Sequence, residues 1–171
     1  GEAEPTLELC GYVNDPEDYA VMSMDDGIIP SGSQNSFDIS LNNSYGVVGF
    51  QLELVDSPDY LSVVDVFTSS RTESFELFFN ESEGSLYIAG YQPELSEMEP
   101  GSGPILEVIF SADDIEDNQV VNLDFQNVIL SDTEAQEVIS FGAGCEITIS
   151  TDLMMGDINS DGVLNILDIV N

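Results

Sequence analysis

Residues 37–55 read FDISLNNSYGVVGFQLELV and contain two segments in which apolar and polar side chains alternate. In residues 37–41 every second side chain is apolar, and the same period recurs within residues 47–55. A period of two places one set of side chains on each face of a β-strand. The polar residues 42–44 between the two segments are typical of a turn. The stretch therefore predicts two strands that each bury one face.

Short apolar runs separated by turns continue on both sides of this stretch, and no segment shows a sustained helical period. Strands that recur about every 8 to 12 residues are typical of an all-β sandwich. We predict such a sandwich for residues 19–150, an acidic strand or linker for 1–18, and a connector with a partial calcium motif for 151–171. The further predicted strands are 19–24, 61–67, 75–79, 85–91, 105–111, 120–130, 137–141 and 145–149, with a Pro- and Gly-rich loop at 100–104.

The charge of the chain is extreme and limits its function. There are 34 Asp and Glu residues, a single basic residue (Arg71) and no His, which gives a formal net charge of -33. Such a surface repels nucleic acids and anionic membranes and attracts divalent cations. Adaptation to a salty environment and calcium loading both explain it, and composition does not separate them.

Catalysis has little support in this composition. Without His or Lys, the chain has no Ser-His-Asp triad and no lysine Schiff base. A pair of carboxylates for glycoside hydrolysis is not excluded, but nothing marks out a particular pair among so many acids. We therefore predict that the protein is not an enzyme.

A calcium-loop pattern occupies residues 157–168, which read DINSDGVLNILD. Oxygen-bearing side chains fall at loop positions 1, 3, 5, 9 and 12, and Gly162 at position 6 permits a sharp reversal. A polar turn before a helix, without metal, is the alternative. A loop of this spacing supplies the six to eight oxygens that Ca²⁺ requires. The predicted ligands are Asp157, Asn159, Asp161, the carbonyl of Val163, Asn165 and Asp168.

The two cysteines, Cys10 and Cys145, lie near opposite ends of the β-rich region and belong to no zinc-binding pattern. A disulfide between them would suit a secreted protein and contribute about 4 to 5 kcal/mol in the chain-entropy model. Two buried free thiols are the alternative. We predict the disulfide.

Two family resemblances follow from these motifs. Residues 156–171, GDINSDGVLNILDIVN, resemble the first calcium repeat of a dockerin, although Ile166 and Leu167 are apolar where dockerins often carry Ser or Thr. The preceding region resembles a cohesin domain. The second resemblance implies a jelly-roll β-sandwich of about nine strands that binds a dockerin through one sheet face. The cohesin resemblance rests on residues 29–33, 37–41, 47–54, 101–106 and 128–132.

The resemblances predict an extracellular assembly module, secreted or at the cell surface, that makes calcium-dependent contacts with a dockerin- or cohesin-like protein. Its C-terminal calcium loop–helix either packs on its own sandwich or docks on the next copy, which would build a head-to-tail filament. We expect no nucleic-acid partner and no membrane span. The alternative is a carbohydrate-binding module, which usually stacks sugars on exposed aromatic side chains. The chain has no Trp, so the candidates are Tyr45, Tyr60, Tyr87 and Tyr91.

Overall fold

Residues 19–152 are described in the computed structural model, and they form twelve β-strands. The strands are β1 (Ala20–Met24), β2 (Gly27–Pro30), β3 (Gln34–Asn43), β4 (Gly49–Ser57), β5 (Leu61–Thr68), β6 (Glu76–Ser82), β7 (Ser85–Tyr91), β8 (Gly101–Ala112), β9 (Gln119–Ser131), β10 (Glu137–Val138), β11 (Ser140–Ala143) and β12 (Cys145–Ser150).

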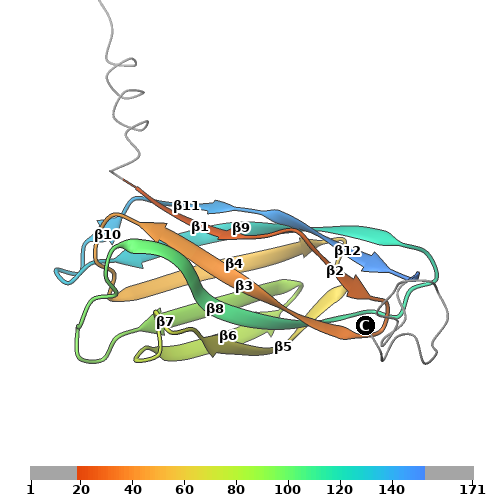
Figure 1. Cartoon of the computed structure of the whole chain (residues 1–171), viewed down its shortest axis with the longest axis horizontal. Helices are drawn as coiled ribbons and strands as arrows, with labels where there is room; N and C mark the ends of the chain where they lie inside the picture. Colours follow the sequence, from red (N-terminus) through yellow and green to blue (C-terminus); the bar gives the residue numbers. More distant parts are fainter. Residues whose placement is uncertain (1–18, 153–171) are drawn as a thin grey trace, which may run out of the picture.

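The strands form two sheets that pack face to face along the long axis of the molecule (Figure 1). The five-stranded sheet has the order β11-β1-β3-β8-β5. The seven-stranded sheet has the order β2-β12-β9-β4-β7-β6, and the short strand β10 also pairs with β9. This arrangement confirms the predicted all-β sandwich.

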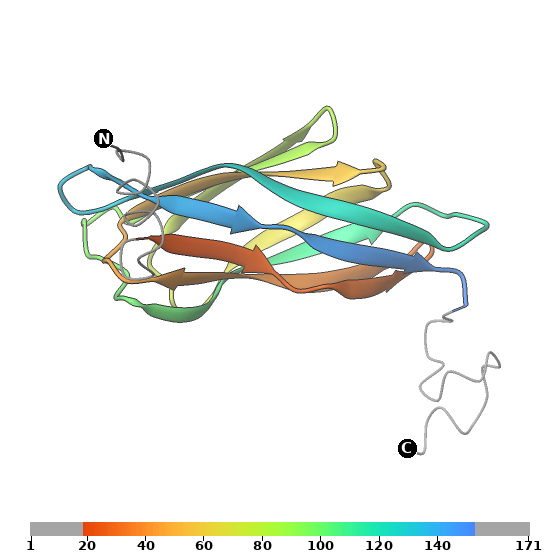
Figure 2. The same ribbon diagram turned by 90° about the horizontal axis from the view of Figure 1, so that it is seen from above.

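Two chain segments cross from one sheet to the other and close one side of the sandwich. β1 and β11 pair in parallel in the five-stranded sheet, and their continuations β2 and β12 pair in parallel in the seven-stranded sheet. The second crossing needs Gly144, because a Cβ atom there would lie 2.5 Å from the carbonyl oxygen of Leu123. The carboxylate of Asp26 accepts a hydrogen bond from the Glu146 amide at 2.8 Å and ties the crossings together. β1 begins at one end of the sandwich and β12 ends at the other (Figure 2).

The core lies between the two sheets and contains the apolar set of each alternating strand. Ile39 and Leu41 of β3 are fully buried, and Leu52 and Leu54 of β4 pack against the same cluster from the other sheet. The alternation in residues 37–55 therefore assigned the buried faces of both strands correctly.

Residues 101–104 are a correction to the sequence prediction, because they begin β8 instead of forming a loop. Gly101 and Gly103 pair with the end of β3. Pro104 lacks an amide proton, and it lies next to a register shift in the β3–β8 ladder, where a missing donor is tolerated. The strand count also exceeds the expected nine, partly because both crossing segments divide into two strands.

Asp56, near the end of β4, organises the connection to β5. Its Oδ2 atom accepts hydrogen bonds from the amides of Tyr60 and Leu61, each at 3.0 Å. Burial raises the pKa of the Asp56 carboxyl above its usual value, although these two bonds oppose the shift. A raised pKa in the folded state means that stability is lost as the pH rises through that pKa.

Asp56→Asn is expected to unfold at the same temperature as the wild type or higher at pH 7, because the amide oxygen still accepts both bonds without a buried charge. The gain should shrink as the pH falls through the raised pKa of Asp56 and should be gone by about pH 4, the ordinary value for an aspartate in an unfolded chain. Asp56→Ala should instead cost about 1–3 kcal/mol, since both amides lose their partner. Thermal unfolding followed by circular dichroism measures each variant. Asp38→Asn, an exposed acid on β3, controls for the lost charge. Equal stabilities for the Asn and Ala variants would contradict the assignment.

Candidate functional site

Half-exposed aromatic side chains gather on the outer surface of four adjacent strands, β6, β7, β4 and β9, which we call the aromatic face. Phe78 of β6 is 57% exposed, and Tyr87 and Tyr91 of β7 are each 46% exposed. Ile129 of β9 extends the apolar surface to the fourth strand. The outward residues are Glu76, Phe78 and Asn80 on β6, Tyr87, Ala89 and Tyr91 on β7, Gly49, Gln51 and Glu53 on β4, and Asn127, Ile129 and Ser131 on β9.

The sequence produces this face by strict alternation. In β7, Leu86, Ile88 and Gly90 point into the core while the residues between them point outward. Gly90 is required here, because a Cβ atom would lie 2.4 Å from the ring of Phe50. The inward set therefore fixes the orientation of β7, and that orientation exposes both tyrosines on one side.

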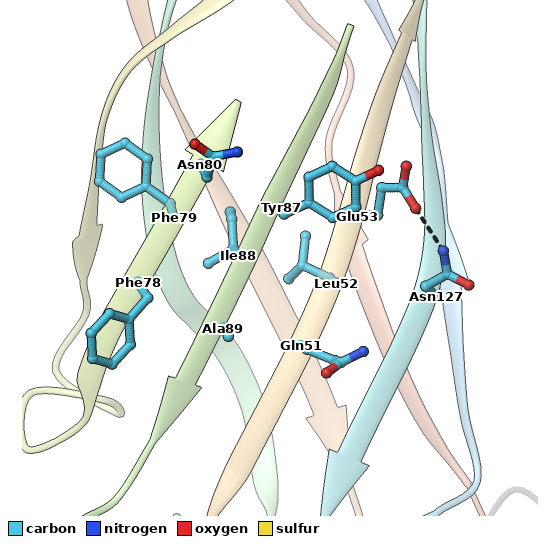
Figure 3. Close-up of a pocket in the computed structure, with 10 residues that line it drawn as sticks. All are labelled: Gln51, Leu52, Glu53, Phe78, Phe79, Asn80, Tyr87, Ile88, Ala89 and Asn127. Carbon is cyan, nitrogen blue, oxygen red and sulfur yellow. Dashed lines mark hydrogen bonds between the residues drawn. The ribbon is translucent and has the colours of Figure 1, made fainter. Parts of the chain in front are cut away.

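Two shallow hollows lie side by side on the aromatic face. The larger, about 360 Å³, lies between Phe78, Tyr87 and Asn127, with Gln51 and Ala89 along its lining (Figure 3). The smaller, about 240 Å³, shares Gln51 and Ala89 with it and reaches Tyr91, Ile129 and Gly49. Ala89 on β7 and Gly49 on β4 are small and leave room between the larger side chains around them. The surface can accept protruding side chains of a partner.

Phe78 and Tyr91 form a ridge beside these hollows. Their rings are parallel within 2°, and their centroids are 6.1 Å apart. The Tyr91 hydroxyl donates a hydrogen bond of 2.7 Å to Glu76, which raises the pKa of Tyr91 and holds its ring in place. The ridge is therefore a fixed apolar surface with a polar end.

Glu53 and Asn127 form the polar side of the larger hollow (Figure 3). The β4–β9 ladder shifts register between Gln51 and Glu53, and Asn127 adopts the left-handed conformation with φ 49°. This bulge brings the Asn127 amide to 2.6 Å from Glu53, to which it donates a hydrogen bond. Hydrogen bonds from Ser85, Tyr87 and Asn127 lower the pKa of Glu53, so the carboxylate is charged at neutral pH although the residue is only 8% exposed.

Within residues 19–152 no basic side chain pairs with Glu53. Arg71 is the one Lys or Arg in the sequence, and its guanidinium donates to acceptors elsewhere. These are the carbonyl oxygens of Leu41, Gly103 and Glu99 and the side-chain oxygen of Asn43. The aromatic face therefore combines apolar ridges with an uncompensated negative charge.

The sequence identified part of this site. Tyr87 and Tyr91 lie together on the aromatic face, whereas Tyr60 packs against the core and Tyr45 follows β3 in a loop. Phe78 was not among the predicted binding residues. The sequence could have indicated it, because two adjacent residues of one strand, Phe78 and Phe79, must point to opposite faces of the sheet. Glu53 and Asn127 were missed because a bulge between distant strands brings them together.

The predicted metal ligands and one cysteine lie outside the described residues. They are Asp157, Asn159, Asp161, Val163, Asn165, Asp168 and Cys10. Within residues 19–152 no group of three or more acidic or cysteine side chains is arranged to hold a metal ion. Cys145 is buried and is bonded to no other residue within 19–152, and burial, with Asp26 and Asp25 nearby, raises the pKa of its thiol to about 11. The Cys10–Cys145 disulfide stays a prediction.

Comparison with solved structures identifies the fold, although comparison of the sequence finds no relatives. No protein-family model matches the sequence, and no curated protein gives a significant match. A non-cellulosomal cohesin from the archaeon Archaeoglobus fulgidus superimposes with a TM-score of 0.66 at 18% identity, over 77% of this chain and 91% of that one. The seventh ScaB type I cohesin of Pseudobacteroides cellulosolvens gives 0.66 at 16%, over 80% and 96%. This chain has the cohesin fold.

A type I cohesin–dockerin complex from Clostridium thermocellum contains a further similar chain. Its TM-score is 0.67 at 10% identity, over 77% of this chain and 94% of that chain. The cohesin fold is a jelly-roll β-sandwich, which confirms the predicted fold class. At these identities the likeness establishes the fold alone, so the function is argued from the aromatic face.

Proposed function

We propose that this chain is an extracellular, non-catalytic assembly module that docks a protein partner on the aromatic face. The observation that carries the proposal is the fixed apolar surface across β6, β7, β4 and β9, with two adjoining hollows. Contiguous exposed apolar surface on a folded domain typically marks an interaction site. Aromatic side chains are also enriched among the residues that dominate binding energy at protein interfaces.

The partner is of the dockerin kind. Solved structures with this fold include complexes of a cohesin with a dockerin. The charge of Glu53 adds a preference. Its carboxylate already accepts hydrogen bonds from Ser85, Tyr87 and Asn127, but no basic side chain within residues 19–152 neutralises it. A partner that places Lys or Arg at the larger hollow would complement this negative charge.

The C-terminal motif gives the module a second, calcium-dependent contact. Residues 157–168 bind Ca²⁺ and order a dockerin-like loop and helix, which dock on the aromatic face of another copy. Such a contact joins two different surfaces, so each added copy leaves one surface free for the next, and a filament forms. Calcium offsets part of the repulsion between acidic copies. An extracellular location suits this calcium chemistry, and residues 19–152 include no helix that is long and apolar enough to span a membrane.

Sedimentation velocity with a panel of purified dockerins tests this function. In millimolar calcium we expect either a complex with a dockerin or, without a dockerin, self-association that increases with protein concentration. In EGTA we expect monomers. Monodisperse monomers in calcium that bind no dockerin would reject the proposal.

Asp157→Ala is expected to abolish a single calcium-binding event in isothermal titration calorimetry, because it removes the first ligand of the loop. The acidic surface will also bind calcium weakly at many points. Asp38→Ala, which removes an exposed carboxylate on β3, is therefore the matched control and should keep the specific event. If both variants titrate like the wild type, residues 157–168 hold no calcium.

Carbohydrate binding is a second candidate function, and the parallel rings of Phe78 and Tyr91 favour it. Sugars stack on such rings, and the neighbouring side chains of Gln51, Asn80 and Glu53 offer hydrogen bonds to hydroxyl groups. Titration with soluble oligosaccharides tests it, with Tyr91→Ala as the variant expected to lose any binding.

A further inference from the structure

A second apolar surface lies on the outer side of the seven-stranded sheet, on strands β2, β12 and β9. Thr148 of β12 pairs with Ile28 of β2 on one side and with Val120 of β9 on the other. Ile28 and Val120 are each 49% exposed. These three side chains form a row across adjacent strands, which we call the β2–β12–β9 row.

The row is open at its β9 end. β4, the next strand in the sheet, pairs with β9 only as far as Asn122, so it does not extend to the position beside Val120. None of the three residues in the row carries a charge, in contrast to most of this acidic surface. The row is therefore suited to cover by uncharged apolar side chains.

The chain leaves the sandwich next to this row. Asn118 accepts hydrogen bonds from the Thr151 amide at 2.7 Å and the Thr151 hydroxyl at 2.9 Å. It also donates to the Asp152 carboxylate at 3.1 Å. Asn118 thereby holds both residues that follow β12, and it lies two positions before Val120 in the chain.

The next residues match the row in chemistry and in length. Nineteen residues, 153–171, follow Asp152, and the first three are Leu153, Met154 and Met155. Three residues in extended form span about 10 Å. Three strands spaced by about 4.8 Å cover the same distance. The first acidic residue of the segment comes only at Asp157, beyond this reach.

We propose that Leu153, Met154 and Met155 of the same chain cover the β2–β12–β9 row. The contact seats the segment that carries the calcium motif against the end of the seven-stranded sheet. It leaves residues 156–171 available for a second copy, and it does not depend on the proposed docking function.

A double-mutant cycle in the full chain tests the contact. Val120→Ser and Leu153→Ser should each raise the unfolding equilibrium constant about fivefold, as expected for loss of about 1 kcal/mol. The double variant should lose no more than either single variant, because both remove the same contact. Val64→Ser, at a valine 45% exposed on β5 of the other sheet, is the control and should combine additively with Leu153→Ser.

Nuclear Overhauser contacts identify the occupant directly. We expect contacts from the ε-methyl groups of Met154 and Met155 to the methyl groups of Val120 and Ile28, independent of protein concentration. Contacts that appear only between labelled and unlabelled copies would make a second copy the occupant and overturn the proposal. The proposal is also overturned if the effects of Val120→Ser and Leu153→Ser on stability add and none of these Overhauser contacts is observed.

Discussion

Arg71→Ala is expected to lower the free energy of unfolding by about 3 kcal/mol, because the guanidinium joins three separate parts of the fold. It donates to the carbonyl oxygen of Leu41 at 2.8 Å and of Gly103 at 3.3 Å, and so holds β3 to the start of β8. A second nitrogen donates to the Asn43 side chain at 2.8 Å and to the Glu99 carbonyl at 3.1 Å. Alanine would leave these acceptors without their donor.

The segment that carries Arg71 is itself hydrogen-bonded to β8. It therefore cannot shift to replace the hydrogen bonds that the alanine variant loses. The Ser69 hydroxyl donates to the Pro104 carbonyl at 2.6 Å, and the buried Thr72 hydroxyl donates to the Ile105 carbonyl. For a chain of this length, 3 kcal/mol corresponds to a fall in the melting temperature of roughly 6–12 °C. Thermal and urea unfolding measure it.

Arg71→Lys and high salt separate hydrogen bonding from charge. Lysine keeps the charge but not the planar fork of donors, so we expect an intermediate loss. If Arg71 acted mainly by reducing repulsion among acidic residues, molar salt would restore the alanine variant, since salt screens exposed charges. We expect the deficit to persist in salt. Full recovery would contradict the structural role.

The sequence predicted the fold where side-chain alternation alone determines a strand. Residues 85–91 form β7 as predicted, because the apolar side chains alternate through the whole strand. β3 extends beyond residues 37–41 at both ends, where polar residues are held by backbone pairing with β8. The loop predicted for residues 101–104 was wrong for the same reason, because these residues are held as a strand by backbone pairing with β3. Their conformation depends on β3 and on Arg71, and neither is visible in local composition.

The candidate site was predictable only in its apolar part. Tyr87 and Tyr91 alternate with core residues of one strand, so their shared outward direction follows from the local pattern. The Glu53–Asn127 pair depends on a register shift between β4 and β9, strands far apart in the sequence. A pattern read along one strand contains no information about that register.

Phe78→Ala and Tyr91→Ala are each expected to weaken binding of the protein partner about 30-fold, which corresponds to roughly 2 kcal/mol. Both side chains form the ridge beside the hollows, and they contact each other. Because Phe78 is 57% and Tyr91 46% exposed in the isolated chain, their truncation should change its melting temperature little. Calorimetric titration of each variant with the dockerin identified by sedimentation measures the effect. Phe67→Ala is the matched control, since Phe67 is comparably exposed but lies on β5 of the other sheet.

Glu53→Gln distinguishes an apolar contact from a charge-specific one on the same face. Glutamine keeps the shape of the side chain and can still accept from Asn127, but it removes the carboxylate. If the partner places Lys or Arg in the larger hollow, affinity should fall about tenfold or more and depend less steeply on salt than in the wild type. Unchanged affinity would mean that the partner supplies only neutral donors. If Phe67→Ala weakens binding as much as Phe78→Ala, the partner does not dock on the aromatic face, because the two residues lie on different sheets.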